Sequence, residues 1–167
     1  RKVVVAMDKA FRNLLKRDYV IFDGAMGTML QAAGMKLGET PEVLNVTNPE
    51  LLVSIHEKYL NAGSDVIYAN TFGANSYKLE DCGYSVDELV AAGIANAKKA
   101  CVNVNPNALV ALDVGPIGQL LEPTGTLSFE EAYEMYAEIV KAGSKAGADL
   151  VVFETMTDLL EVKAAVL

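Results

Sequence analysis

The sequence predicts an α/β fold of repeated strand–helix units around a parallel sheet. Four short apolar runs, at 19–23, 66–70, 109–113 and 150–154, each end in one polar residue. Continuous apolar runs of this length are typical of strands that are buried on both faces. The polar residues Asp23, Asn70, Asp113 and Glu154 are separated by 47, 43 and 41 residues. Each interval can hold a strand, a loop, a helix and a return, which is the spacing of βα units.

A weak internal repeat supports the same fold. Residues 62–71 align with residues 146–155, and in both a small residue and Gly close a helix before Asp opens a strand. Asn70 and Glu154 are then equivalent positions of successive units. Ligands of α/β barrels and open α/β sheets bind at the carboxyl ends of the strands. The four terminal polar residues are therefore predicted to form a ligand-facing rim, the alternative being that they only start turns and cap helices.

Composition limits the class of protein. The 167 residues are enough for one domain with a sizeable core, and 51% hydrophobic with 22% charged residues is typical of a soluble globular protein. The net charge of −8 argues against nucleic acid or an anionic membrane as partner. No apolar stretch approaches the roughly 20 residues of a spanning helix. Two cysteines give no disulfide framework, so a reducing cytoplasm is expected.

The N-terminal part is predicted as a leader and short helix over residues 1–18, with helical periodicity from Met7 to Asp18. The first strand then enters a Gly-rich turn at residues 23–28. Gly24 and Gly27 let the backbone turn tightly and expose N–H groups to a small anion such as a carboxylate. An ordinary strand-to-helix turn is the alternative, because the turn lacks both the Gly-x-Gly-x-x-Gly pattern and a phosphate-binding Lys.

The next helix contains the one histidine of the chain. Residues 31–47 are predicted to be irregular, and Asn48 with Pro49 is predicted to start a helix as N-cap and first-turn proline. His56 lies on the shoulder of the buried face of that helix. A single helical His without a second ligand nearby is most often structural, so no catalytic or metal role is assigned to it.

The later helices have clear start signals. Ser85 with Glu88, and Ser128 with Glu131, are predicted capping boxes. Cys101 follows the apolar face of the first of these helices and is predicted to be a buried small hydrophobe. Cys82 lies in a loop, 19 residues away. The two cysteines have no paired Cys or His, so this chain alone is not expected to make a zinc site.

The last helical pattern, after residues 155–158, runs to Leu167 without a Gly or Pro stop signal. Four βα units are half of an eight-unit barrel, which typically needs about 250 residues. A fragment of a barrel is therefore predicted, and an open sheet with helices on both faces is the alternative. A half-barrel would expose two sheet edges, so it is predicted to associate with a second copy or with missing chain.

Four ordered motifs carry a resemblance to a known family. They are Asp23-Gly24-Ala25-Met26-Gly27-Thr28, Asn70-Thr71-Phe72-Gly73-Ala74-Asn75, Asp113-Val114-Gly115-Pro116 and Phe153-Glu154-Thr155. The chain resembles the homocysteine S-methyltransferase family, above all its bacterial cobalamin-dependent members, over roughly residues 10–167. The resemblance implies a (βα)8 TIM barrel that binds homocysteine at the strand carboxyl ends. Residues 19–167 would be about its first half, with four βα units.

The resemblance also implies a chemistry. In the family, zinc held by three cysteine thiolates binds the homocysteine sulfur and keeps it as the nucleophilic thiolate. The thiolate takes a methyl group from methylcobalamin, itself loaded from methyltetrahydrofolate, to give methionine. Folate- and cobalamin-binding domains of the same enzyme bring the donor. The three zinc-binding cysteines belong to later strands, and Cys82 and Cys101 do not match them. This fragment alone is therefore expected to be inactive.

Carried over by motif, the resemblance assigns the amino-acid end of homocysteine to this chain. Glu154 and Asp23 would accept hydrogen bonds from the ammonium group, and backbone N–H groups around Ala25 and Met26 would hold the carboxylate. The implied substrate-binding set is Asp23, Gly24, Ala25, Met26, Thr71 and Glu154, with Asn70 and Asp113 as supporting residues.

Three alternatives stay open. The methyl donor of a related enzyme could be betaine or an S-methylated amino acid such as S-methylmethionine. The chain could be a non-catalytic half-barrel that acts in assembly. It could also be an open-sheet enzyme with magnesium on Asp23, Asp113 and Glu154, because hard cations prefer carboxylate oxygens.

Overall fold

A computed structural model describes residues 9–167 of the chain. Its centre is a parallel sheet of three strands, β1 (Val66–Tyr68), β2 (Leu109–Val114) and β3 (Leu150–Phe153), in the order β1-β2-β3. Each strand is followed by a helix before the next strand begins, which confirms the predicted α/β class with a parallel sheet. The closed eight-unit barrel, and the division of the chain at residue 18, stay predictions.

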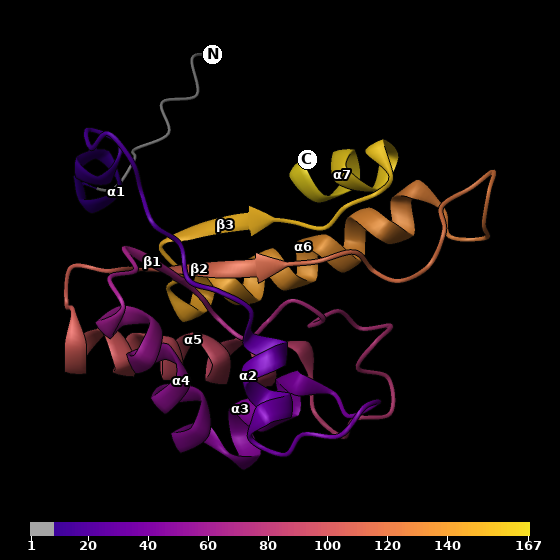
Figure 1. The fold of residues 1–167 in the computed structure, drawn as a ribbon. Coiled ribbons are helices and arrows are strands. Elements are labelled where there is room, and N and C mark those ends of the chain that lie inside the picture. The colour runs from indigo at the N-terminus through magenta and orange to yellow at the C-terminus, as the bar shows by residue number, and fades with distance from the viewer. Residues whose placement is uncertain (1–8) are drawn as a thin grey trace.

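The helices surround this sheet on more than one side. Figure 1 shows α1 near the end where the strands begin, and α2 and α3 near the end where β1 leads into its loop. The bounds are α1 (Lys9–Leu14), α2 (Met26–Ala32), the 3-10 turn η1 (Pro41–Val43), α3 (Leu44–Thr47), α4 (Pro49–Asn61), α5 (Val86–Val104), α6 (Phe129–Ala146) and α7 (Leu159–Val166). None of the helices in the described range is long and apolar enough to cross a membrane.

One face of the sheet packs against the helices. Alternate residues of β2, namely Val110, Leu112 and Val114, belong to the large core that also contains buried side chains of α5 and α6. The approach of α6 is close, since a Cβ on Gly143 would lie 2.5 Å from Cδ2 of Leu112. The absence of a side chain at Gly143 therefore lets helix and strand meet directly.

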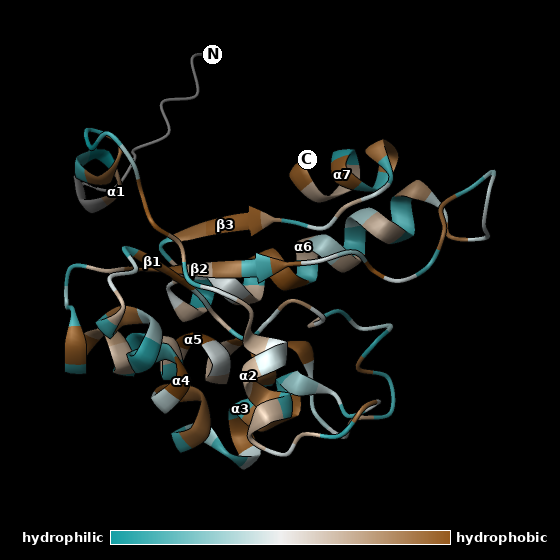
Figure 2. Cartoon of the chain, viewed as in Figure 1, coloured by the Kyte–Doolittle hydropathy of each residue, from teal (hydrophilic) through white to brown (hydrophobic). Residues whose placement is uncertain are grey.

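The opposite face of the sheet changes character along the strands. Near the strand starts, Val66, Leu109 and Ala111 are buried, with Phe11 and Leu14 from around α1 packed against them. The next residue on this face of β2 is Asp113, because side chains alternate between the two faces. Figure 2 shows the same change, as β2 is hydrophobic over most of its length and hydrophilic near its tip. A polar region therefore begins where the strands end.

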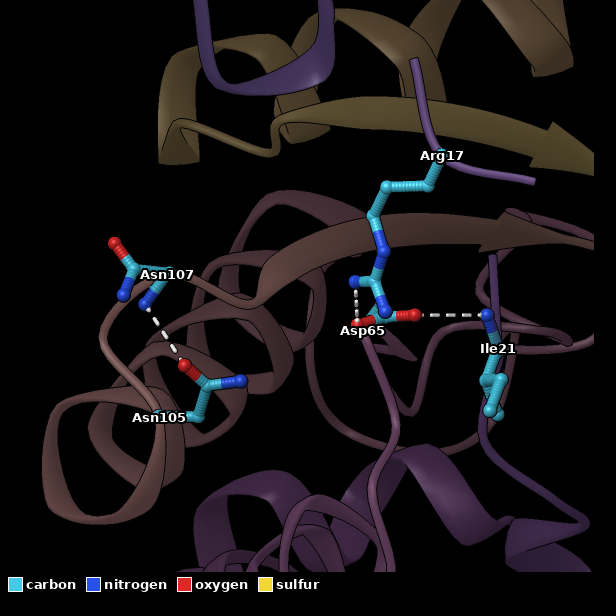
Figure 3. A network of polar contacts seen from close by, with 5 residues as sticks. All are labelled: Arg17, Ile21, Asp65, Asn105 and Asn107. Carbon is cyan, nitrogen blue, oxygen red and sulfur yellow. Dashed lines mark hydrogen bonds and ion pairs between the residues drawn. The ribbon is translucent and has the colours of Figure 1, made fainter. Parts of the chain in front are cut away.

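The predicted first strand is wrong. Its residues form one isolated bridge, between Phe22 and Val66, and Tyr19 and Ile21 are 68% and 45% exposed. Asp65 holds the segment instead, through an ion pair with Arg17 and a 3.0 Å hydrogen bond from the Ile21 N–H (Figure 3). In the described range this segment has a strand neighbour on one side only, so its backbone has no second ladder to hold it as a strand.

Burial on both faces is also wrong for β3. Val151 is 38% exposed, and the other residues of β3 are only partly buried. Residues 31–47 are less irregular than predicted, because η1 and α3 form two short helical elements there. The predicted helix over residues 7–18 is shorter, ending at Leu14, and residues 7 and 8 lie outside the described range.

Most predicted helix starts are confirmed. Helix α4 begins at Pro49, although the side chain of Asn48 makes no capping hydrogen bond. Both capping boxes, Ser85 with Glu88 and Ser128 with Glu131, are present in full. These signals are local, so neighbouring residues alone determine them.

Candidate ligand-binding site

A cavity of about 460 Å³ lies at the carboxyl ends of the strands. Its lining includes the predicted residues Asp23, Gly24, Ala25, Met26, Asn70, Asp113 and Glu154. Thr71 is the one member of the predicted set that is not in this lining. Sequence reasoning missed Glu42, Tyr68 and Phe72, which also face the cavity. The predicted rim therefore comes together in three dimensions, with additional residues from the loops.

Asp23 is fixed at one side of this cavity. Its Oδ1 accepts a 3.0 Å hydrogen bond from the backbone N–H of Tyr68. Burial raises the pKa of Asp23 to about 7, with a further contribution from the negative charge of Glu154. Near neutral pH, Asp23 is thus divided between its neutral and charged forms, and a cation that entered the cavity would favour the charged form.

Asp113 is the most buried of the predicted acidic residues, at 8% exposed. Its Oδ1 has no hydrogen-bond partner in the described part of the chain. Burial raises the pKa of Asp113 to about 8, and the charges of Glu154, Asp23 and Glu42 add to that rise. A buried carboxyl oxygen without a partner, on a cavity wall, is a position that a ligand donor can fill.

Thr71 supports Asp113 from behind. The Thr71 hydroxyl donates to the backbone oxygen of Asp113 at 2.8 Å and accepts from its backbone N–H at 3.1 Å. Thr71 is also only 1% exposed. Its side chain is therefore used within the protein, which corrects the expectation that it would face the ligand.

The Gly-rich turn lines the cavity with residues 23–27. A Cβ on Gly24 would lie 3.0 Å from the Tyr59 ring, and the Tyr59 hydroxyl donates to the Ala25 oxygen at 3.0 Å. Tyr59, from α4, thus fixes the turn. Helix α2 begins directly after it, at Met26, and the N-cap Ala25 offers no side-chain acceptor. First-turn N–H groups of a helix without such a cap need another acceptor, and a carboxylate suits them.

Glu154 follows β3, and its backbone N–H donates to the Val114 oxygen at 3.1 Å. The next residue, Thr155, has a φ of 57°. A β-branched residue in the left-handed region costs on the order of 1–3 kcal/mol and is typical of functional sites. The chain therefore accepts local strain where Glu154 meets the cavity.

Two buried glutamates, Glu161 and Glu42, were not predicted from the sequence. Glu161 of α7 is 4% exposed, and its Oε1 accepts from the Ile117 N–H at 2.8 Å and the Tyr136 hydroxyl at 2.9 Å. This carboxylate ties the loop after β2 to α6 and α7. Glu42 lies in η1, directly after Pro41. Because Pro favours the first position of a helix, Pro41 was the available sequence signal for a helical turn at this point.

His56 lies in the helix layer and does not line the cavity. It is fully buried, neither ring nitrogen has a partner in the described residues, and burial lowers its pKa to about 4. A neutral, structural His agrees with the expectation from the sequence. Cys101 is buried, as predicted, and Cys82 is partly buried.

Metal binding finds no support in residues 9–167. No group of three or more His, Cys, Asp or Glu side chains there is arranged to hold a metal ion. The magnesium alternative therefore lacks its site. The zinc of the resembling family does not fit these residues either, because the two cysteines do not form a ligand cluster.

Comparison with known proteins identifies the family. The family model described as homocysteine S-methyltransferase matches residues 20–167. The match covers most of the chain, and the fold places the family motifs around one cavity. This chain belongs to the homocysteine S-methyltransferase family, a family of transferase enzymes.

The relatives and solved structures agree with that family. Methionine synthase of Mycobacterium tuberculosis is 33% identical over 171 residues, which cover 96% of this chain and 14% of that protein. Methionine synthase of Mycobacterium leprae is 34% identical over 92% of this chain and 14% of its own length. The homocysteine methyltransferase MmuM of Escherichia coli, in its metallated form, superposes with a TM-score of 0.80 at 29% identity, covering 93% of this chain and 60% of that one. The oxidised form of MmuM gives 0.81 at 30% identity, over 94% and 60%. The chain therefore spans a small part of the synthases and about three fifths of MmuM.

Proposed function

We propose that this chain is the amino-acid-binding part of a methionine synthase and occupies about the first half of its homocysteine-binding (βα)8 barrel. The observation that carries the proposal is the cavity, where Asp23 and Glu154 lie beside the uncapped start of α2. Acidic side chains suit an ammonium group, and free N–H groups suit a carboxylate. An α-amino acid such as homocysteine carries both groups on one carbon.

Each residue then has a role in binding. Glu154 and Asp23 accept hydrogen bonds from the substrate ammonium, and N–H groups around Ala25 and Met26 hold its carboxylate. Gly24 keeps the turn close to Tyr59. Asn70 and Asp113 shape the cavity wall, and Thr71 holds the backbone of Asp113. The substrate thiol would then extend away from this chain, toward the rest of the barrel.

The methyl transfer itself needs groups outside this chain. We infer that zinc, held by cysteines of the missing part, binds the homocysteine sulfur and lowers its pKa so that the thiolate forms. Cobalamin- and methyltetrahydrofolate-binding domains of the same cytoplasmic enzyme would supply the methyl group. The chain by itself would bind substrate without transferring a methyl group.

The other donors are less well supported. Two relatives at 33% and 34% identity are named methionine synthase. MmuM is 29% to 31% identical in the structural superpositions. Betaine or S-methylmethionine would be recognised mainly by parts of a barrel that this chain lacks. A non-catalytic half-barrel that self-associates would be recognised by a stable dimer in solution that does not bind homocysteine.

Glu154→Gln tests the proposed function. In the full-length protein we expect weaker L-homocysteine binding by about 1.5–3 kcal/mol, because a charge-assisted hydrogen bond to the ammonium is lost. Isothermal titration calorimetry measures the affinity. Glu130→Gln is the matched control, since Glu130 is exposed in the first turn of α6 and should leave the affinity unchanged. Equal affinities of Glu154→Gln and wild type would refute the assignment.

A further inference from the structure

Glu42 is a buried carboxylate in the cavity wall. It is 3% exposed, and its Oε1 accepts a 2.6 Å hydrogen bond from the backbone N–H of Gly73. The fit is close, since a Cβ on Gly73 would lie 2.9 Å from the same oxygen. The ion pairs in residues 11–167 are Arg17–Asp65, Lys98–Asp149 and Lys145–Asp87, and none of them includes Glu42.

Three buried asparagines hold the segment that carries Glu42. The Nδ2 of Asn45 donates to the backbone oxygen of Asn70 at 2.8 Å, and the Nδ2 of Asn96 donates to the backbone oxygen of Asn45 at 2.9 Å. The Nδ2 of Asn70 donates in turn to the backbone oxygen of Pro41, the residue before Glu42, at 2.8 Å, and to the Oδ1 of Asn45 at 2.9 Å. A satisfied buried network of this kind rigidifies the backbone. Glu42 is therefore presented to the cavity from a fixed position.

Asp113, whose Oδ1 has no hydrogen-bond partner among the described residues, lines the same cavity. Buried polar atoms are almost always hydrogen-bonded. The Oδ1 of Asp113 is therefore an independent sign that a hydrogen-bond donor of a ligand can bind in the cavity. Glu42, Asp23 and Glu154 line the cavity with it. Buried negative charges are costly unless a cation lies close by. In the described residues these carboxylates form no ion pair. The Lys78 ammonium lies 5.4 Å from the ring centroid of Phe72, which lines the cavity, and its charge opposes the rise in the pKa of Glu42. A cationic group of a ligand would add to this compensation.

The electrostatics of Glu42 point the same way. Burial raises the pKa of Glu42, while the Gly73 N–H and the charge of Lys78 oppose that rise. The Lys78 ammonium itself donates to the Pro116 oxygen at 2.8 Å, without forming an ion pair with Glu42. The charge of Glu42 also contributes to the raised pKa of Asp113. Glu42 thus adds to the negative potential that a ligand would meet.

We propose that Glu42 is a specificity-determining residue that selects ligands with an ammonium group, so that the cavity prefers an amino acid to the same thiol acid without its amino group. The proposal rests on the proposed function and extends it, because it assigns to η1 a part in substrate discrimination. The amides of the Gly-rich turn would hold either ligand through its carboxylate. The acidic wall would favour only the ligand that carries the positive charge.

Glu42→Gln in the full-length protein tests this inference. Gln keeps the shape of the side chain and an oxygen for the Gly73 N–H, but it removes the charge. We expect a loss of about 10-fold or more in L-homocysteine affinity, as for the loss of one charged partner. The affinity for the thiol acid without the amino group should change by less than about 2-fold, because that ligand has no cation for the carboxylate. Calorimetry with both ligands gives the ratio.

Glu39→Gln is the control, because Glu39 is exposed in the same segment and bonds to the Lys36 N–H. It should leave both affinities unchanged. An equal loss for both ligands in Glu42→Gln would show a merely structural residue and would overturn the inference, as would an unchanged ratio. Failure of the wild-type protein to bind homocysteine would overturn the proposed function as well. Binding by wild type with no change of preference in Glu42→Gln would overturn the role of Glu42 alone.

Discussion

The acidic residues at the two ends of the sheet differ in whether they form ion pairs within the protein. At the end where the strands begin, Asp65 pairs with Arg17 and accepts from Ile21, as Figure 3 shows. Asp149 lies 3.7 Å from Lys98 and accepts from the Val110 N–H at 2.8 Å. At the end where the strands finish, the acidic residues of the cavity have no ion pair with any side chain of residues 11–167.

This difference separates carboxylates that are paired within the protein from those proposed to bind a ligand. A hollow of about 630 Å³ lies at the strand-start end and is larger than the cavity at the other end. Its size alone does not make it a site, because the chain already neutralises its acidic groups. Asp113, in contrast, has a raised pKa, and its Oδ1 has no hydrogen-bond partner in the part of the chain that the structure describes. The proposed ligand site is therefore distinguished by carboxyl groups without an ion pair in the described residues, and not by the volume of its cavity.

Asp113→Asn should give the largest effect. The folded-state pKa of Asp113, about 8, lies above its unfolded value of 3.8, so the folded state holds the proton more tightly. The stability from this proton is present below about pH 4 and is lost as the pH rises toward 8. Asn should remove that pH-dependent loss, on the order of 3–5 kcal/mol between pH 4 and 8.5. Urea unfolding of the variant and wild type at both pH values measures the difference.

The same variant sharpens the contrast between stability and binding. At pH 8.5 we expect Asp113→Asn to be more stable than wild type, yet to bind homocysteine more weakly. Wild-type stability that changes with pH by the same amount as in the variant would mean that Asp113 does not titrate as described. The acidic cluster would then not differ from the paired residues at the other end.

Asp65→Ala should give an intermediate effect of the opposite kind. It removes an ion pair with Arg17 and the acceptor of the Ile21 N–H. The Arg17 side chain is 49% exposed, so solvent weakens the ion pair and the expected loss of stability is only about 1–2 kcal/mol. Thermal unfolding measures this loss. Homocysteine affinity should be unchanged, and a selective loss of affinity would break the division between the two ends.

Lys98→Met should give the smallest effect. The side chains of Lys98 and Asp149 are 42% and 34% exposed, and such surface pairs contribute about 0–1 kcal/mol. The methylene stem is kept, so packing along α5 is largely preserved. A loss clearly above this range in chemical unfolding would show that the paired end is more than a neutralised surface.

Several features could be predicted from the sequence because they depend on near neighbours. The capping boxes at Ser85 and Ser128 are defined within four residues, and both form. The strands β2 and β3 follow continuous apolar runs, and side-chain alternation then places Asp113 and Glu154 where ligands of parallel sheets bind. The Gly-rich turn at residues 23–27 reaches the same cavity.

Other features depend on distant parts of the chain. Whether Thr71 faces a ligand was decided by the backbone of Asp113, 42 residues away, which takes both hydrogen bonds of the hydroxyl. Residues 19–23 are apolar enough for a strand, but they form only a bridge because they have a single strand neighbour in the described range.

The amino-acid sequence by itself determined the class of fold, the helix starts and the family motifs, since these arise from local periodicity and spacing. Only the tertiary structure decided that Glu42 would be 3% exposed beside Gly73 and that one oxygen of Asp113 would find no partner among the described residues. Burial and pairing are properties of the neighbours that folding brings together. The ionisation of the acidic groups in the cavity, on which the proposed ligand preference depends, follows from those neighbours.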